Sequence, residues 1–389
     1  MVARHFKGSS PLPKLPKKLF SSQPKADDWN INWTTVKIVA GTFLGALVAG
    51  LSVYTPSKET VKDVIDLFPE RIPPALEKAR VTWSAAEAEY VSRPDIEAKI
   101  NDYLDSKTTS YCVIYGAKGV GKSEVVNHTA IGRRAVVKVP VTSVGNQDDL
   151  VALIMSKLTG KKISLDIDLL VDILKKCKAD GFIPTIIFDV ERSSSAQPVL
   201  RIVRGLAKAL VGYCRCIIVL SEANAVLEFG GDRHREKFIF IDEMSKSEAK
   251  QLLQVRGARF SEEELRYIFE SIGTSPVALI DLMSEVPKIP LKEYVDNVLR
   301  DAYRKLFNFP LNPILVALKE HPEGVSFDYF KNQKYEGVKM SDPNQVGAAM
   351  KKCNAIMYRI ELGKYQLMST AHKTVLKTYN PEESKSTAK

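Results

Sequence analysis

One short segment constrains the fold of this 389-residue chain more than any other. An apolar run, YCVIY at 111–115, leads directly into the octapeptide GAKGVGKS at 116–123. The octapeptide matches GxxxxGK[ST] at every fixed position. Its glycines let backbone N–H groups turn toward a phosphate, and the helix that follows points its positive end at the same place. The sequence therefore predicts a strand, a loop that binds the phosphates of ATP, and a helix.

Each part of this loop has an expected role. The Lys122 ammonium is expected to reach the β- and γ-phosphate oxygens, and the Ser123 hydroxyl to ligate Mg²⁺. The other residues are expected to bind phosphate mainly through their backbone, and these are Gly116, Ala117, Lys118, Gly119, Val120 and Gly121. The predicted cofactors are ATP and Mg²⁺, with ADP as the other nucleotide that the loop would hold.

A second apolar run, TIIF at 185–188, ends at the acid Asp189. In a site of this kind such an acid holds Mg²⁺ through water. Glu191 lies two residues further, so in an extended strand it points to the same side as Asp189. It is expected to orient or deprotonate the attacking water. The alternative is that Glu191 is a solvated acid paired with Arg192.

The order of apolar and amphipathic segments predicts an α/β fold at 90–242. Strands are expected at 111–115, 135–141, 185–190, 216–220 and 238–241, separated by helices. Buried strands that alternate with helices indicate a parallel sheet covered on both faces, which here is a P-loop ATPase core.

Two further regions are expected after the core. Residues 243–305 read as an all-helical lid. In 306–380, a helix around 313–319 and a longer polar helical stretch precede a β-hairpin that turns at 361–363. Helices followed by a hairpin are typical of a winged-helix-like domain, and 381–389 is expected to be a disordered tail.

The N-terminal residues predict a membrane anchor. Residues 1–35 form a basic tail rich in Pro and Ser, which partly matches a mitochondrial transit segment. Residues 36–54 contain an uncharged apolar run flanked by aromatic residues, and they predict a single transmembrane helix. A buried core helix is the alternative. Residues 55–89 read as a charged connector. The five cysteines have no zinc-finger spacing and are expected to be reduced core thiols.

Several segments in the expected order resemble the AAA+/STAND type of ATPase, in the broad sense that includes archaeal-style ATPases. These are YVSRPDIEAKINDYL, CRCIIVLSEAN, FGGDRHREKFIFIDEMSKSEAKQLL and IGTSPVALIDLM, within residues 90–285. The resemblance implies an adenine flanked by Arg93 and Glu97, and a polar sensor at Ser221, with Asn224 as second choice. It also implies a lid motif with Gly273 and Pro276. An arginine that reaches a neighbouring subunit would be Arg235 or Arg233.

The favoured function is a membrane-anchored, ATP-binding and ATP-hydrolysing molecular switch. Its protein partner is not specified by the sequence, and self-association is a further possibility. This chain departs from the usual adjacent pair of acids, because Val190 separates Asp189 from Glu191. The first alternative is therefore an interaction module that binds nucleotide without hydrolysing it. The second is a membrane-tethered nucleic-acid-binding protein that uses 306–380, which is less favoured because the basic excess there is small. The expected location is an organelle membrane, with the mitochondrial inner membrane first and the ER or another endomembrane second.

Overall fold

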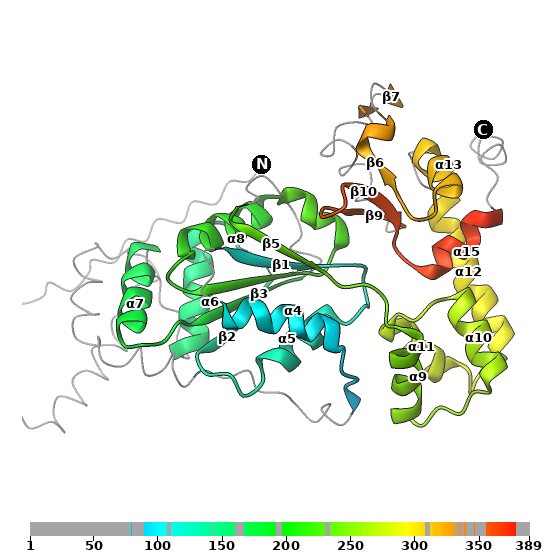
Figure 1. Cartoon of the computed structure of the whole chain (residues 1–389), viewed down its shortest axis with the longest axis horizontal. Coiled ribbons are helices and arrows are strands. Elements are labelled where there is room, and N and C mark those ends of the chain that lie inside the picture. Colours follow the sequence, from blue (N-terminus) through cyan, green and yellow to red (C-terminus); the bar gives the residue numbers. More distant parts are fainter. Residues whose placement is uncertain are drawn as a thin grey trace, which may run out of the picture. The chain divides into compact units, whose positions relative to one another are not determined.

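The computed structural model describes most of the chain from residue 89 onward (Figure 1). The described residues are 79, 89–106, 110–142, 144–159, 167–191, 197–229, 234–307, 312–330, 334–335, 338–339, 346 and 355–378. The predicted tail at 1–35, the predicted span at 36–54 and the predicted tail at 381–389 lie outside them, as does nearly all of the connector. Among the helices that are described, none has the length and apolar character to cross a bilayer.

Five parallel strands form the central sheet, in the order β2-β3-β4-β1-β5. They are β1 (Tyr111–Tyr115), β2 (Val136–Val141), β3 (Thr185–Val190), β4 (Arg215–Leu220) and β5 (Glu236–Phe240). Their continuous apolar runs fit strands that are covered on both faces, and every residue of β1 is buried. Strand β5 starts two residues before its predicted start, because Glu236 already pairs in register with Tyr111 of β1. The buried Glu236 carboxylate forms an ion pair with Arg204 at 2.7 Å. The predicted parallel α/β sheet is confirmed.

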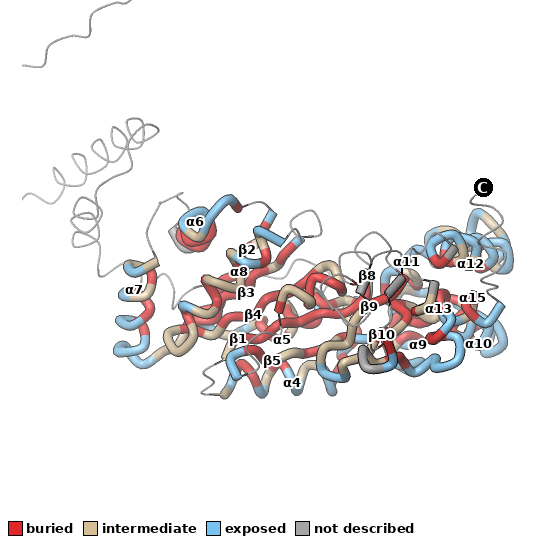
Figure 2. Tube along the Cα trace, turned by 90° about the horizontal axis from the view of Figure 1, so that it is seen from above, coloured by how far each residue is buried: buried red, intermediate tan, exposed pale blue. Residues whose placement is uncertain are grey.

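Helices cover both faces of this sheet (Figure 2). On one face lie α4 (Pro94–Asp105) and α5 (Lys122–Ala130), whose buried residues share a core cluster with Ile114, Ile187 and Ile217. On the other face lie α6 and α8. The remaining bounds of the core helices are α6 Gln147–Thr159, α7 Ile167–Ala179, α8 Gln197–Leu210 and the 3₁₀ helix η3 Ala223–Glu228. The loop at 116–123 therefore connects β1, which lies between β4 and β5, to a helix that packs directly on the sheet.

The predicted all-helical region contains four helices. They are α9 (Lys246–Val255), α10 (Glu262–Ser271), α11 (Pro276–Glu285) and α12 (Leu291–Phe307). Two of them begin with a capping box, formed by Ser245 with Glu248 and by Ser261 with Glu264. The helices pack through a cluster of their own, which includes Leu252, Ile268, Leu279 and Val295.

The C-terminal region contains the predicted hairpin, formed by β9 (Ile356–Arg359) and β10 (Lys364–Leu367). The predicted helix is α13 (Asn312–Glu320), and α15 (Thr370–Thr378) follows the hairpin. The other elements are β6 Val325–Ser326, η4 Phe327–Phe330, β7 Lys334–Tyr335 and β8 Val338–Lys339. Strands β7 and β8 pair antiparallel, so the expectation of one long polar helix before the hairpin was wrong there.

Candidate nucleotide-binding site

The loop at 116–123 has the backbone shape that its glycines predict. Gly119 and Gly121 both have φ of +85°, in the region that L side chains rarely adopt. A Cβ atom added to Gly119 would lie 2.9 Å from the Cβ of Val277, which contacts the loop from helix α11. Glycine at 119 therefore serves both the turn and the close approach of a second element.

Lys122 is the first residue of α5, and its side chain folds back over the loop. The ammonium donates hydrogen bonds to the carbonyl oxygens of Gly116 (3.0 Å) and Ala117 (2.7 Å). Lys122 is 6% exposed, and this burial lowers the pKa of its ammonium to about 8, against an opposing pull from Asp189. A buried cation that only carbonyl dipoles satisfy is well placed to bind a polyanion at the mouth of the loop.

The two predicted magnesium ligands lie together. Ser123 Oγ donates to Asp189 Oδ1 at 3.3 Å, so the hydroxyl from α5 and the carboxylate at the end of β3 face one point. A hydroxyl and a carboxylate are hard oxygen ligands of the kind that Mg²⁺ prefers. The other carboxylate oxygen, Oδ2, lies 2.9 Å from Nζ of Lys138 on β2. The donor set fits Mg²⁺, with a lysine beside it that motif reasoning did not assign.

Glu191 and Ser221 lie at the same carboxyl edge of the sheet. Each continues a strand ladder by one backbone hydrogen bond, from Glu191 N to Val141 O and from Ser221 N to Val190 O, both at 3.2 Å. The side chain of Glu191 is exposed, whereas Ser221 is half-buried beside β1. Asn224 is used elsewhere, because its Nδ2 donates to Ile356 O at 2.9 Å.

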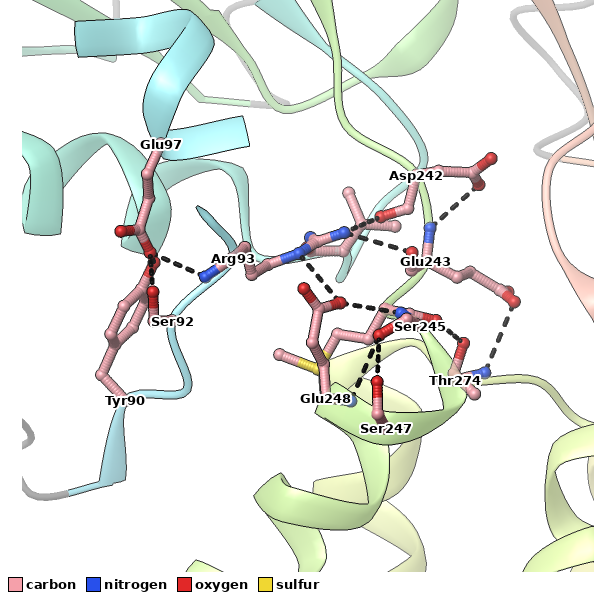
Figure 3. A network of polar contacts seen from close by, with 12 residues as sticks. Tyr90, Ser92, Arg93, Glu97, Asp242, Glu243, Ser245, Ser247, Glu248 and Thr274 are labelled. Atoms are coloured by element: carbon pink, nitrogen blue, oxygen red, sulfur yellow. Dashed lines mark hydrogen bonds and ion pairs between the residues drawn. The ribbon is translucent and has the colours of Figure 1, made fainter. Parts of the chain in front are cut away.

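The structure gives Arg93 a part in shaping the loop (Figure 3). Its guanidinium donates to Val120 O at 2.9 Å, to Asp242 O at 3.0 Å and to Glu243 O at 3.1 Å. Burial lowers the pKa of Arg93, while Glu248 opposes that effect. Glu97, the other residue expected beside the adenine, accepts from Tyr90 Oη and from the Arg93 backbone N–H, both at 2.7 Å.

Arg235 lies far from this loop on its own chain. It precedes β5, and its carbonyl oxygen accepts a hydrogen bond from the N–H of Tyr111, the first residue of β1. The loop follows the last residue of β1, so the two ends are separated by the length of the strand, roughly 15 Å. Arg235 is exposed. Any contact with a γ-phosphate would therefore be with that of a second subunit. Arg233 lies outside the described residues.

The predicted lid motif contacts the loop directly. The N–H of Val277 and the hydroxyl of Ser275 both donate to Gly119 O, at 3.2 and 3.1 Å. Pro276 is the first residue of α11 and lies near Gly121. The start of α11 is thus held against the predicted phosphate-binding loop.

Glu243 joins three regions beside this contact. It follows β5, and its carboxylate accepts from Thr370 Oγ1 (2.7 Å) and Thr370 N (3.2 Å) at the start of α15. It also accepts from Thr274 N at 3.4 Å, next to the lid motif (Figure 3). Core, lid and C-terminal region therefore share one carboxylate.

The C-terminal hairpin packs on the strand that leads into the loop. Tyr115, the residue before Gly116, donates through its hydroxyl to Glu361 and accepts from Ile360 N at 3.2 Å. The Arg359 guanidinium lies 3.5 Å from the ring centroid of Phe240 on β5. The turn of the hairpin is therefore held by the α/β core.

Sequence reasoning missed Lys138, Glu243 and Tyr115. Lys138 carried a signal, since it is the one charged residue in the run VVKVPV. The other two act through contacts with residues more than 100 positions away, which local patterns do not reveal.

No protein-family model and no curated protein matches this chain. Among solved structures, it is similar to a Walker-type ATPase of Pyrococcus abyssi, with 14% identity, 77% of this chain and 97% of that one covered, and a TM-score of 0.48. It is also similar to a STAND protein with a tetratricopeptide repeat sensor from Pyrococcus horikoshii, with 17% identity, 79% of this chain and 44% of that one covered, and a TM-score of 0.35. A third similar structure is the Aeropyrum pernix ORC1 protein in complex with DNA, with 15% identity, 79% of this chain and 96% of that one covered, and a TM-score of 0.35.

These likenesses are too distant to support an inference about this chain. The features of the chain itself are enough to identify its fold. An inner parallel strand, β1, runs into a GxxxxGK[ST] loop and a helix, and an acid at the end of β3, two strands away, faces the loop serine. The core has a P-loop nucleotide-binding fold.

Proposed function

We propose that the chain is a Mg²⁺-dependent ATP-binding switch of the AAA+/STAND type that hydrolyses ATP. The observation that carries this proposal is the meeting of the buried Lys122, Ser123 and Asp189 at one loop. Ser123 and Asp189 would hold the Mg²⁺, which would supply positive charge that neutralises the phosphates. Lys122 and the N–H groups at the start of α5 would bind the phosphate oxygens.

In hydrolysis, a water oxygen forms a bond to the γ-phosphorus while the bond to the bridging oxygen breaks. ADP leaves with that electron pair, and the proton of the water passes to a base. Glu191 lies at the correct edge of the sheet for this base, and Ser221 for a polar contact with the γ-phosphate. The charge that develops is stabilised by groups already in place, with Arg235 available to a second subunit if the chain self-associates.

The contact between Gly119 and the start of α11 supports a conformational change that depends on nucleotide. Phosphate that enters the loop has to coexist with Ser275 and Val277, which already hold Gly119 O. Through Glu243, a movement of the lid would change the contact with α15. Nucleotide state would thus alter the C-terminal region and the protein partner that it binds.

A binding module without hydrolysis is the second candidate, favoured by the exposed side chain of Glu191 and its separation from Asp189. The nucleic-acid reading is weakened, because the turn of the hairpin is held against Tyr115 and Phe240. A winged-helix-like domain that packs on the core agrees better with a protein-binding role. Salt-dependent DNA binding by the full chain would reverse that order.

Turnover separates the first two candidates. We expect Glu191→Gln to bind Mg–ATP as the wild type does and to lose hydrolysis by about 100-fold or more, the usual contribution of a general base. Phosphate release under saturating ATP measures the rate of hydrolysis, with Glu293→Gln, at an exposed residue of α12, as the matched control. Turnover in Glu191→Gln equal to that of the control would make Glu191 a bystander. No phosphate release by the wild type would favour the binding module.

We also propose that residues 36–54 anchor the chain in an organelle membrane, with the mitochondrial inner membrane first. The uncharged run, its flanking aromatic residues and the basic segment 1–26, which contains no Asp or Glu, support this.

A further inference from the structure

Lys138 is the charged residue of an otherwise apolar strand, and its partner is the acid of the proposed metal site. In the β2–β3 register, Lys138 pairs with Ile187 and Pro140 pairs with Asp189, so the lysine starts one pleat below the carboxylate. Its stem extends along the sheet until Nζ lies 2.9 Å from Asp189 Oδ2. The side chains are 29% and 19% exposed, so water screens the pair only in part.

The two oxygens of Asp189 therefore serve different partners. Oδ1 accepts from Ser123 on the side of the loop, and Oδ2 holds the ammonium of Lys138. A divalent cation beside Ser123 would approach a carboxylate whose charge Lys138 already neutralises, and it would meet a like charge within one carboxylate width. Binding of the metal is then most favourable when the lysine moves away. The long flexible stem of a lysine allows this movement.

We propose that Lys138 competes with Mg²⁺ for Asp189. This competition sets the Mg²⁺ concentration that is needed for the site to bind the Mg²⁺–nucleotide complex. The lysine holds the carboxylate while the metal is absent and releases it when metal and nucleotide enter together. The ATP-binding site thereby prefers a metal that arrives with triphosphate over metal alone. This inference rests on the proposed function, because Ser123 and Asp189 are the magnesium ligands only in that proposal.

The proposal differs from a structural role of the ion pair. If Lys138 only stabilises the sheet, its removal lowers the unfolding temperature and leaves the metal requirement unchanged. If it competes, replacing it with methionine, which keeps the apolar stem and removes the charge, lowers the Mg²⁺ concentration needed for half-maximal nucleotide binding. Arginine at 138 keeps the charge and the competition. In an Asp189→Asn background, Lys138→Met no longer shifts the requirement, because the shared carboxylate is gone.

The test is a Mg²⁺ titration of the full chain, starting from an EDTA buffer at constant ionic strength, with a fluorescent ATP analogue as the probe. We expect the Mg²⁺ midpoint of Lys138→Met to fall about tenfold, the order expected for one partly screened charge. The midpoint of Lys138→Arg stays near that of the wild type. Lys237→Met, which removes an exposed strand lysine on β5, is the matched control and keeps the wild-type midpoint.

A second readout keeps the two proposals separate. The shift of the unfolding temperature with Mg²⁺ is recorded for the same variants without nucleotide. If the wild type binds no nucleotide with or without metal, the proposed function fails, and this second midpoint alone decides the role of Lys138. Equal midpoints in wild type, Lys138→Met and Lys237→Met overturn the inference. A lower midpoint in Lys138→Met that disappears in the Asp189→Asn background supports it.

Discussion

His372 on α15 makes the stability of the C-terminal region depend on pH. It is 7% exposed, and its Nδ1 lies 2.7 Å from Ser369 Oγ. Burial lowers its pKa to about 4; Lys305 acts in the same direction and Asp301 against it. Between pH 6.5 and 4 the unfolded chain therefore binds a proton that the folded chain does not, so stability falls as pH falls through this window.

We predict that His372→Gln removes this part of the acid sensitivity. Between pH 7 and 4.5, the wild type should lose about 2 kcal/mol more free energy of unfolding than the variant. Urea unfolding at the two pH values measures the difference. His321→Gln, at a histidine whose side chain is 46% exposed, is the control and should behave as the wild type. The same pH-dependent loss in His372→Gln and wild type would show that His372 is not the source.

Residues were predictable from sequence where one backbone pattern carries the function. Lys122 and Ser123 lie in a motif whose spacing defines their positions, and Asp189 ends an apolar strand. Arg93 was recognised as important, but its guanidinium turned out to bind three backbone carbonyl oxygens. Such a contact depends on how Val120 and the segment after β5 meet, and a local pattern contains no information about that meeting.

At the scale of elements, we expect the contact between the start of α11 and the loop at 116–123 to be the one most sensitive to nucleotide. Gly273 precedes α11 with φ of +91°, and a Cβ atom there would lie 2.5 Å from Glu243 Oε2. An alanine at 273 therefore disturbs the carboxylate that joins core, lid and α15. Gly257 has φ of +79° but open space around it, so an alanine there causes backbone strain without a clash.

We predict that ATP protects the 273–276 segment of the wild type from proteolysis. At a hundredfold excess over Kd, cleavage through the open state should slow by up to about 100-fold. Gly273→Ala should lose most of this protection, and Gly257→Ala should retain it. Limited proteolysis with and without Mg–ATP, followed by mass spectrometry, measures both. Cleavage that is identical with and without ATP in the wild type would mean that the lid does not respond to nucleotide.

The elements most readily predicted were the buried strands and the hairpin at 356–367. Their apolar runs and the glycine at 363 are local signals. The β7–β8 pair was missed because Lys334–Tyr335 and Val338–Lys339 are each two residues long, too short to show the alternation typical of a strand. The sequence between them, Glu336-Gly337, contains a turn residue that argues against one continuous helix. The docking of the hairpin on β1 and β5 depends on distant contacts, and local sequence does not encode it.

At the scale of the whole molecule, the proposed anchor would decide in which compartment the nucleotide-binding core works. Residues 1–37 carry more Lys and Arg than the short segment after the run, which favours an N-terminus on the matrix or synthesis side. In the proposed mitochondrial inner membrane, that orientation would place the core in the intermembrane space, unless the large folded region overrides the charge bias. We predict that the protein resists carbonate extraction from mitochondrial membranes and that a chain lacking 36–54 is released. Release of the full chain into the soluble fraction would contradict a transmembrane helix at 36–54. Absence of the protein from mitochondria would contradict the proposed location.

The proposed function depends on nucleotide binding at the loop, and equilibrium binding of Mg–ATP to the wild type and to Lys122→Ala tests this most directly. Lys246→Ala is the control, since Lys246 is also the first residue of a helix but is exposed. Loss of a buried, charge-assisted contact with phosphate should weaken binding by about 100-fold in Lys122→Ala and leave the control unchanged. Wild-type affinity in a correctly folded Lys122→Ala variant would contradict the account.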